Sequence, residues 1–151
     1  MASGPDDLIR KSNPLFEAVG KNWVHCGAVP NAGMMKLAVN IVLSTALSGL
    51  MEGAHFSQKA DLDLTTFFKL ILSGPLGNDM FAIKAKKIME QDYAPQASIG
   101  TVHEMLKHIM DTAYETGAFI PNTASNMNLT RSAMNMGLSD EDACAIMKVF
   151  S

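Results

Sequence analysis

The sequence of 151 residues carries little charge: 18% of its residues are charged, and the formal net charge is −3. Lysine and arginine are interspersed with aspartate and glutamate, so the chain has neither a basic stripe for nucleic acid nor a polybasic patch for a membrane surface. We therefore expect no nucleic-acid partner and no membrane partner. With 48% hydrophobic residues, a chain of this length is sufficient for one globular domain with its own core.

Cysteines and known catalytic motifs are also scarce. The two cysteines, Cys26 and Cys144, lie far apart and form no C-x-x-C pair, which predicts reduced thiols in a cytoplasmic protein. The N-terminal MASGPDDLIRKS has no apolar segment of the signal-peptide type, so secretion is not expected. No G-x-S-x-G, P-loop or G-x-G-x-x-G motif occurs.

The histidines do not form a metal-binding pattern. His103 and His108 resemble the helix of zinc proteases, but they are five residues apart rather than four. Five residues turn a helix by about 140° beyond a full turn, so the two imidazoles would diverge. His25 and His55 have no visible partners in the sequence and are expected to be structural or surface residues. We expect no metal.

The dominant feature is the run from Ala32 to Ser57, which contains no proline and has apolar residues on every face. At about 1.5 Å per residue it predicts a helix of roughly 39 Å. A helix that is apolar all round has to be covered, so we expect an all-α domain of several helices built around this central helix. Its uncharged part, Leu37 to Met51, is interrupted by polar residues and is too short for a membrane span.

Shorter helices are expected after this run, because apolar residues recur at helical spacing between capping and terminating residues. The candidate first residues are Asp61 or Asp63, Asn78 or Asp79, Ser98 or Thr101, and Pro121 with Thr123. The candidate ends are Ser73-Gly74, Gly117 and Gly137. A capping box of Ser139 and Asp142 predicts a last helix. The lysines of the second of these helices, Lys84, Lys86 and Lys87, are expected to face solvent.

Residues 1–29 have a different character. Pro5, followed by two aspartates, predicts a helix start, and Pro14 is expected to kink or end that helix. Asn22 to Cys26, NWVHC, is the one convincing strand candidate. A single strand has no partner inside this chain, so this segment predicts the remnant of a sheet located elsewhere or a strand that pairs with another copy.

The chemical signal in the long helix is Lys36 with Asn40 one turn later on the same face. Burial and the positive end of the helix dipole would both lower the pKa of a lysine in the first turns of an apolar helix. Such a lysine can transfer a proton near neutral pH, and the amide of Asn40 can hydrogen-bond the same substrate without adding charge. The structural alternative is a lysine that extends from the helix end into solvent.

The block from Val19 to Asn40, VGKNWVHCGAVPNAGMMKLAVN, resembles the domain junction of β-hydroxyacid dehydrogenases. That family includes 3-hydroxyisobutyrate dehydrogenase, tartronate semialdehyde reductase and, more distantly, 6-phosphogluconate dehydrogenase. In these enzymes the last Rossmann strand leads through a glycine-rich turn into a long helix with lysine and, four residues later, asparagine. The likeness continues through Asp92-Tyr93-Ala94-Pro95 and through the segment 137–142, GLSDED, and covers essentially the whole chain.

The resemblance implies an oxidoreductase that transfers hydride between NAD or NADP and a small β-hydroxyacid. It implies that Lys36 is the general acid/base, that Asn40 orients the substrate, and that the helical domain dimerises through its long helix. Two positions differ from the family pattern. Ala32 replaces a glycine, and Glu104 falls at the position of a lysine near the cofactor. Glu104 is equally explained as the acidic end of a Thr101-x-x-Glu104 capping box.

The resemblance also predicts the domain organisation. Residues 1–29 are expected to be the end of a Rossmann nucleotide-binding domain, and residues 30–151 the all-α C-terminal domain. The glycine fingerprint that binds the pyrophosphate does not occur in the sequence, so the chain is expected to be inactive alone. The alternative is a non-catalytic helical dimerisation or interaction module with a vestigial lysine.

Overall fold

The computed structural model describes residues 1–150. These residues form the helices α1 (Asp6–Val19), α2 (Asn31–Lys59), α3 (Leu64–Ser73), α4 (Asp79–Glu90), α5 (Ile99–Thr116) and α6 (Pro121–Asn135) and the 3-10 helix η1 (Ala143–Val149). Residues 1–150 contain isolated β-bridges but no β-strand, which confirms the predicted all-α class. The chain divides into two compact units, Met1–Val42 and Leu43–Ser151, and the division falls within α2.

In the first unit, two extended segments pair on either side of α1 in the sequence. The amide of Ala2 donates to the carbonyl of Val24 at 2.9 Å, and the amide of Cys26 donates to the carbonyl of Ala2 at 2.8 Å, in a parallel bridge. The prediction that Asn22–Cys26 has no partner in this chain is therefore wrong, because the residues before α1 supply one. Two parallel segments connected through a helix have the arrangement of a βαβ unit.

The helix α1 does not end at Pro14 but continues to Val19, so the prediction that this proline could end the helix is wrong. Pro14 has no backbone N–H to donate within the helix. Residues on either side of it are held by contacts with the second extended segment. The Trp23 indole donates to Asn13 Oδ1 at 2.9 Å, and the Trp23 and Phe16 rings have centroids 5.0 Å apart. These contacts hold α1 from both sides of the proline.

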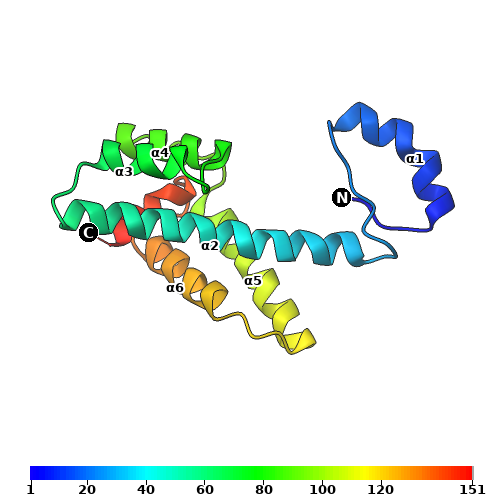
Figure 1. Ribbon diagram of the computed structural model, residues 1–151. Helices are drawn as coiled ribbons and strands as arrows, with labels where there is room; N and C mark the ends of the chain where they lie inside the picture. The colour runs from blue at the N-terminus through cyan, green and yellow to red at the C-terminus, as the bar shows by residue number, and fades with distance from the viewer. Residues whose placement is uncertain (151) are drawn as a thin grey trace. The chain divides into compact units, whose positions relative to one another are not determined.

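In the second unit, the core forms around the C-terminal half of α2. Leu50, Met51 and Ala54 of this half are at most 4% exposed and belong to the main hydrophobic cluster. Figure 1 shows α3 and α4 on one side of this part of α2 and α5 and α6 on the other. Gly53 permits close packing, because a Cβ there would lie 3.0 Å from the ring of Phe67 in α3. The predicted central helix is confirmed for this half.

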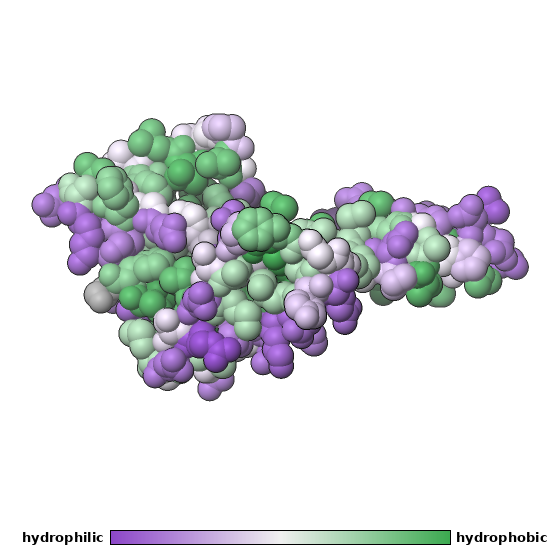
Figure 2. All heavy atoms as spheres, turned by 90° about the horizontal axis from the view of Figure 1, so that it is seen from below, coloured by the Kyte–Doolittle hydropathy of each residue, from purple (hydrophilic) through white to green (hydrophobic). Residues whose placement is uncertain are grey.

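The other half of α2 is not covered as the sequence predicted. Several of its apolar side chains are exposed, whereas Asn40 and Ser44 are buried at 7% and 8% exposure. The exposed apolar residues include Met34, Met35, Val39, Val42 and Leu43. Figure 2 shows hydrophobic groups, in green, at the surface among hydrophilic ones. By length and composition alone α2 could also cross a membrane, a test that core helices of soluble proteins pass as well.

The helices α3, α4 and α5 each begin after one of the two capping residues that the sequence predicted for them. Asp63 caps α3 by accepting from the Thr66 amide at 2.7 Å, and Asn78 caps α4 by accepting from the Phe81 amide at 2.9 Å. Ser98 caps α5. The Thr101-x-x-Glu104 capping box is therefore wrong, because Thr101 already lies inside the helix that Ser98 caps.

The predicted solvent-facing position of Lys84 and Lys87 is wrong. Only Lys86 is exposed, while Lys84 and Lys87 are 6% and 9% exposed. Lys84 Nζ donates to both oxygens of Asp142, at 2.7 and 2.8 Å, and the Asp142 side chain is fully buried. Lys87 Nζ donates to Asp92 Oδ2 at 3.1 Å and to a backbone carbonyl of the 91–98 loop at 2.7 Å. Lysines at positions 84 and 87 share one face of α4, and that face points inward.

Asp142 connects three segments of the second unit. Besides the bonds from Lys84 in α4, its carboxylate accepts from the backbone amide of Gln96 in the preceding loop at 2.9 Å. It also accepts from the amide of Cys144 at 3.1 Å and so caps η1. The predicted capping box of Ser139 with Asp142 is thus wrong, since Asp142 is itself the cap and the last helix is a 3-10 helix. Burial raises the pKa of the Cys144 thiol to about 12, and the hydrogen bond with Asp142 adds to this.

The Asp142 carboxylate makes stability depend on pH. Burial alone would raise the pKa of Asp142, but the hydrogen bonds from Lys84, Gln96 and Cys144 together outweigh it and lower the pKa to about 2. Because the pKa is lower in the folded state than the ordinary 3.8, the stabilisation is complete above pH 4 and is lost as the pH falls through 2.

We expect Asp142 to contribute about 2 kcal/mol to the loss of stability between roughly pH 5 and pH 2. Urea unfolding of the wild-type chain and of Asp142→Asn at several pH values measures this contribution. The difference in unfolding free energy between the two proteins should shrink by that amount as the pH falls. A difference that stays constant over this range would contradict the assignment.

Candidate functional site

The first unit contains a turn that leads from the second extended segment into α2. Gly27 has a φ of +86°, in the left-handed region that favours glycine. The peptide bond between Val29 and Pro30 is cis, a feature that the sequence did not indicate. The amides of Gly33 and Met34 both donate to the carbonyl of Pro30, at 2.9 and 3.3 Å, and this closes the first turn of α2.

Lys36 and Asn40 lie on α2 just after this turn, one helical turn apart. The helix is unbroken from Asn31 to Lys59, so the two residues share a face as the sequence predicted. Lys36 is exposed, so the expected burial of this side chain is wrong, and it lies in solvent as in the structural alternative. Within residues 1–150 its amine has no hydrogen-bond or ion-pair partner. Asn40 is 7% exposed. The pair therefore combines a solvent-exposed amine with a buried amide, and the two side chains do not hydrogen-bond each other.

A surface pocket of about 550 Å³ lies in the same unit, at the carboxyl ends of the two paired extended segments. It is lined by Gly4, Pro5, Asp6, Gly27, Ala28 and Val29. In open α/β folds, ligands bind outside the carboxyl ends of parallel strands, and two glycines allow close approach to the backbone here. The chain leaves this pocket at Val29 and begins α2 two residues later, a few residues before Lys36.

His25 holds this end of the first unit together. Its Nε2 lies 3.0 Å from the carbonyl oxygen of Gly4 and 3.2 Å from that of Gly27, so the ring joins both sides of the pocket. Its Nδ1 lies 3.6 Å from the Asp6 carboxylate, at the start of α1. These partners fit the structural role expected for His25, and sequence spacing alone could not show them.

Glu104, the third residue singled out in the sequence, lies in the second unit on α5. Its side chain is exposed, and it has no hydrogen-bond or ion-pair partner among the residues that the structure describes. Since Ser98 caps α5, no local structural role explains this carboxylate. No group of three or more metal-ligating side chains occurs within residues 1–150.

The fold of this chain is shared with dehydrogenases of known structure. The crystal structure of 3-hydroxyisobutyrate dehydrogenase from Salmonella typhimurium matches it with a TM-score of 0.90 at 23% sequence identity. The match covers 99% of this chain and 53% of that protein. The class of protein is therefore a helical domain of the type found in these enzymes.

A family model described as "NAD-binding of NADP-dependent 3-hydroxyisobutyrate dehydrogenase" matches residues 31–150, and the chain belongs to this family. This confirms the family resemblance that the junction sequence indicated. The chain is 25% identical to the chloroplastic glyoxylate/succinic semialdehyde reductase 2 of Arabidopsis thaliana over 148 residues, which are 98% of the chain and 41% of the reductase. It is also 25% identical to L-threonate dehydrogenase of Escherichia coli K12, over the whole chain and 50% of that enzyme.

The chain thus spans about half the length of the curated relatives that it matches. The family model covers α2 from its first residue, with Lys36 and Asn40, and all the helices that follow.

Proposed function

We propose that this chain is the helical half of an NAD(P)-dependent dehydrogenase or reductase that acts on a small β-hydroxyacid. The observation that carries the proposal is the Lys36–Asn40 pair on an unbroken helix, directly after a pocket at the carboxyl ends of two parallel segments. Membership of the family supports the nicotinamide cofactor, NAD or NADP. The residues 1–29 would then be the end of the nucleotide-binding domain and 30–151 the helical domain.

The cofactor supplies or accepts hydride at the carbon of the substrate, and this chain supplies the proton. In this proposal Lys36 donates a proton from its ammonium form to the carbonyl oxygen in reduction, and in its amine form it removes the proton from the hydroxyl in oxidation. The Asn40 amide hydrogen-bonds the substrate and holds the reacting oxygen beside Lys36. The backbone at Gly4 and Gly27 would contact the cofactor, since both glycines line the pocket. A role for Glu104 near the cofactor remains a prediction.

A chimera tests this function. The nucleotide-binding half of E. coli L-threonate dehydrogenase, fused ahead of Met1, should complete the protein, because the matched region is the other 50% of that enzyme. We expect the chimera to oxidise a small hydroxyacid with reduction of NAD or NADP, followed by absorbance of the reduced cofactor. The chain alone should show little activity. A folded chimera that binds cofactor but oxidises no hydroxyacid would instead favour the non-catalytic dimerisation module.

We propose that the exposed apolar side of α2 is covered by a second copy of the chain. Met35, Val39 and Val42 recur at spacings of four and three and so share a face, and all are at least 44% exposed. A patch of this kind marks a protein interface.

Both cysteines are free thiols, which supports the reducing, cytoplasmic location proposed for the protein.

Light scattering should give twice the 16.3 kDa chain mass at micromolar concentration. Val42→Glu, at a position 69% exposed on this face, should produce a monomer. The matched control is Leu70→Glu, which changes an equally exposed residue of α3 at 67% and should leave the dimer intact. A wild-type monomer would refute the proposed interface.

A further inference from the structure

Most of the fully buried side chains of α6 are polar, although Leu129 and Met134 of the same helix also pack against the hydrophobic core. The buried residues of α6 are Thr123, Asn126, Thr130 and Ala133. Thr130 is fully partnered, because its hydroxyl lies 2.8 Å from His103 Nδ1 and donates to the carbonyl of Met127 at 2.9 Å. Asn126, one turn earlier, is 7% exposed, and its Nδ2 has no hydrogen-bond partner within the described residues.

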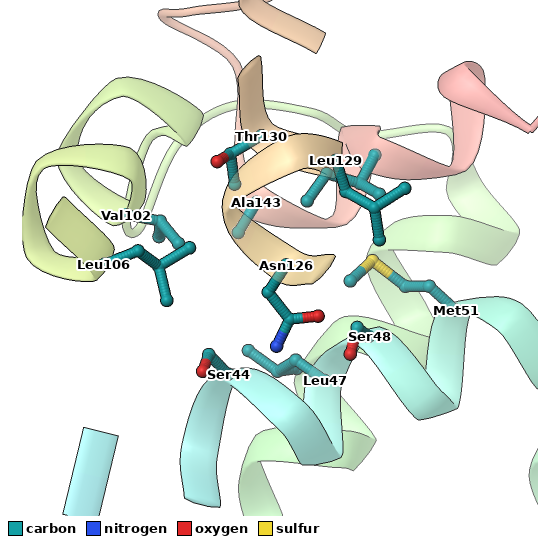
Figure 3. Close-up of a pocket in the computed structure, with 11 residues that line it drawn as sticks. Ser44, Leu47, Ser48, Met51, Val102, Leu106, Asn126, Leu129, Thr130 and Ala143 are labelled. Carbon is teal, nitrogen blue, oxygen red and sulfur yellow. The ribbon is translucent and has the colours of Figure 1, made fainter. Parts of the chain in front are cut away.

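The unpartnered amide lies against a cavity of the second unit. Residues of α2, α5, α6 and η1 line this cavity, most of them apolar. Figure 3 shows the Asn126 side chain pointing from α6 toward α2, between Ser44 and Ser48. The Ser48 hydroxyl donates to the Thr45 carbonyl at 3.0 Å, so its oxygen can still accept a hydrogen bond. The cavity therefore offers one free donor and at least one acceptor on opposite walls.

The size of the cavity decides what it can hold. Its volume is about 20 Å³, measured as the space open to the centre of a water-sized sphere. One water molecule needs at least roughly 10–15 Å³ on this measure. A carboxylate or any metabolite is larger, so a single water is the ligand that both fits the space and can accept from an amide.

We propose that this cavity is a binding site for one ordered water molecule, which accepts from Asn126 Nδ2 and donates to Ser48 Oγ. Such a water links α6 to α2 across a cavity whose lining is mostly apolar. It satisfies an amide whose burial without a partner would otherwise destabilise the folded chain. The site is independent of the proposed dehydrogenase function.

Solution NMR of the ¹⁵N-labelled wild-type chain tests the proposal directly. We expect the Asn126 side-chain amide protons to show a cross-peak at the water frequency, with NOE and ROE of opposite sign, as for a long-lived bound water. Asn128, exposed on the same helix two residues later, is the matched control and should show only the signature of surface water. An observable Asn126 amide without this cross-peak would overturn the proposal.

A second readout uses stability. Asn126→Leu fills the site with an apolar side chain of similar size. If the water is bound, the substitution expels it and leaves Ser48 facing a methyl group, so the thermal midpoint should fall. If the site is dry, the same substitution removes an unpaired donor and the midpoint should rise, which would refute the proposal. Asn128→Leu, on the exposed side, should shift the midpoint little in either case.

Discussion

Lys84→Met is expected to lower the free energy of unfolding by about 3–5 kcal/mol, because removing one partner of a buried ion pair leaves the other charge uncompensated. The partner is Asp142, whose side chain has no solvent exposure and lies 2.7 Å from the lysine amine. Methionine matches the length and flexibility of lysine, so the loss would come from the charge rather than from a cavity. Urea unfolding followed by circular dichroism measures the change.

Lys86→Met is the matched control on the same helix. Lys86 is 73% exposed and lies 4.0 Å from Glu90 in a surface ion pair, so its replacement should change stability by less than about 0.5 kcal/mol. If Lys84→Met were as mild as Lys86→Met, the buried pair would not stabilise the second unit. The double variant Lys84→Met, Asp142→Leu should recover only part of the loss, because Asp142 also accepts from the amides of Gln96 and Cys144.

Lys36→Met is expected to lower kcat of the chimera by 10²- to 10⁴-fold, the usual contribution of a positioned general acid/base. The substitution removes the proton carrier from an exposed site with no structural partner, so folding and cofactor binding should be unchanged. Steady-state kinetics with a hydroxyacid, together with a cofactor titration, separate the two effects.

Asn40→Ala and Lys86→Met complete this series. If Asn40 positions the substrate, its replacement should raise KM as well as lower kcat, whereas loss of Lys36 should affect mainly kcat. Lys86→Met removes a lysine far along the sequence and should leave both constants unchanged. A Lys36→Met chimera with wild-type kcat would remove the chemical basis of the proposed function and favour the vestigial lysine.

The parts of the fold that could be predicted depend on local signals. The long helix from Asn31 to Lys59 follows from a run without proline, and Asp63, Asn78 and Ser98 are caps because their side chains reach amides only three residues ahead. The left-handed Gly117 ends α5 for an equally local reason. The spacing of Lys36 and Asn40 is likewise a property of one helix.

The parts that failed depend on distant partners. Lys84 was expected to face solvent because lysine costs least there, but it is paired with a carboxylate 58 residues away. The pairing of Asn22–Cys26 with Ala2 escaped prediction because only five residues precede α1, too few to show a strand pattern. The buried polar side chains of α6 were not predicted, because apolar residues of the same helix also recur at helical spacing. The ion pair of Lys84 and the pairing of Ala2 leave no trace in local periodicity.

The buried thiol of Cys144 gives the protein an internal reporter. Burial raises the pKa of this thiol to about 12, so almost none of it is thiolate at neutral pH, and Cys144 is 1% exposed. The thiolate reacts with alkylating reagents and peroxides, so this sulfur is modified at an appreciable rate only after η1 moves away from the helices it packs against. The rate at which Cys144 is modified therefore measures how often the carboxyl-terminal segment opens.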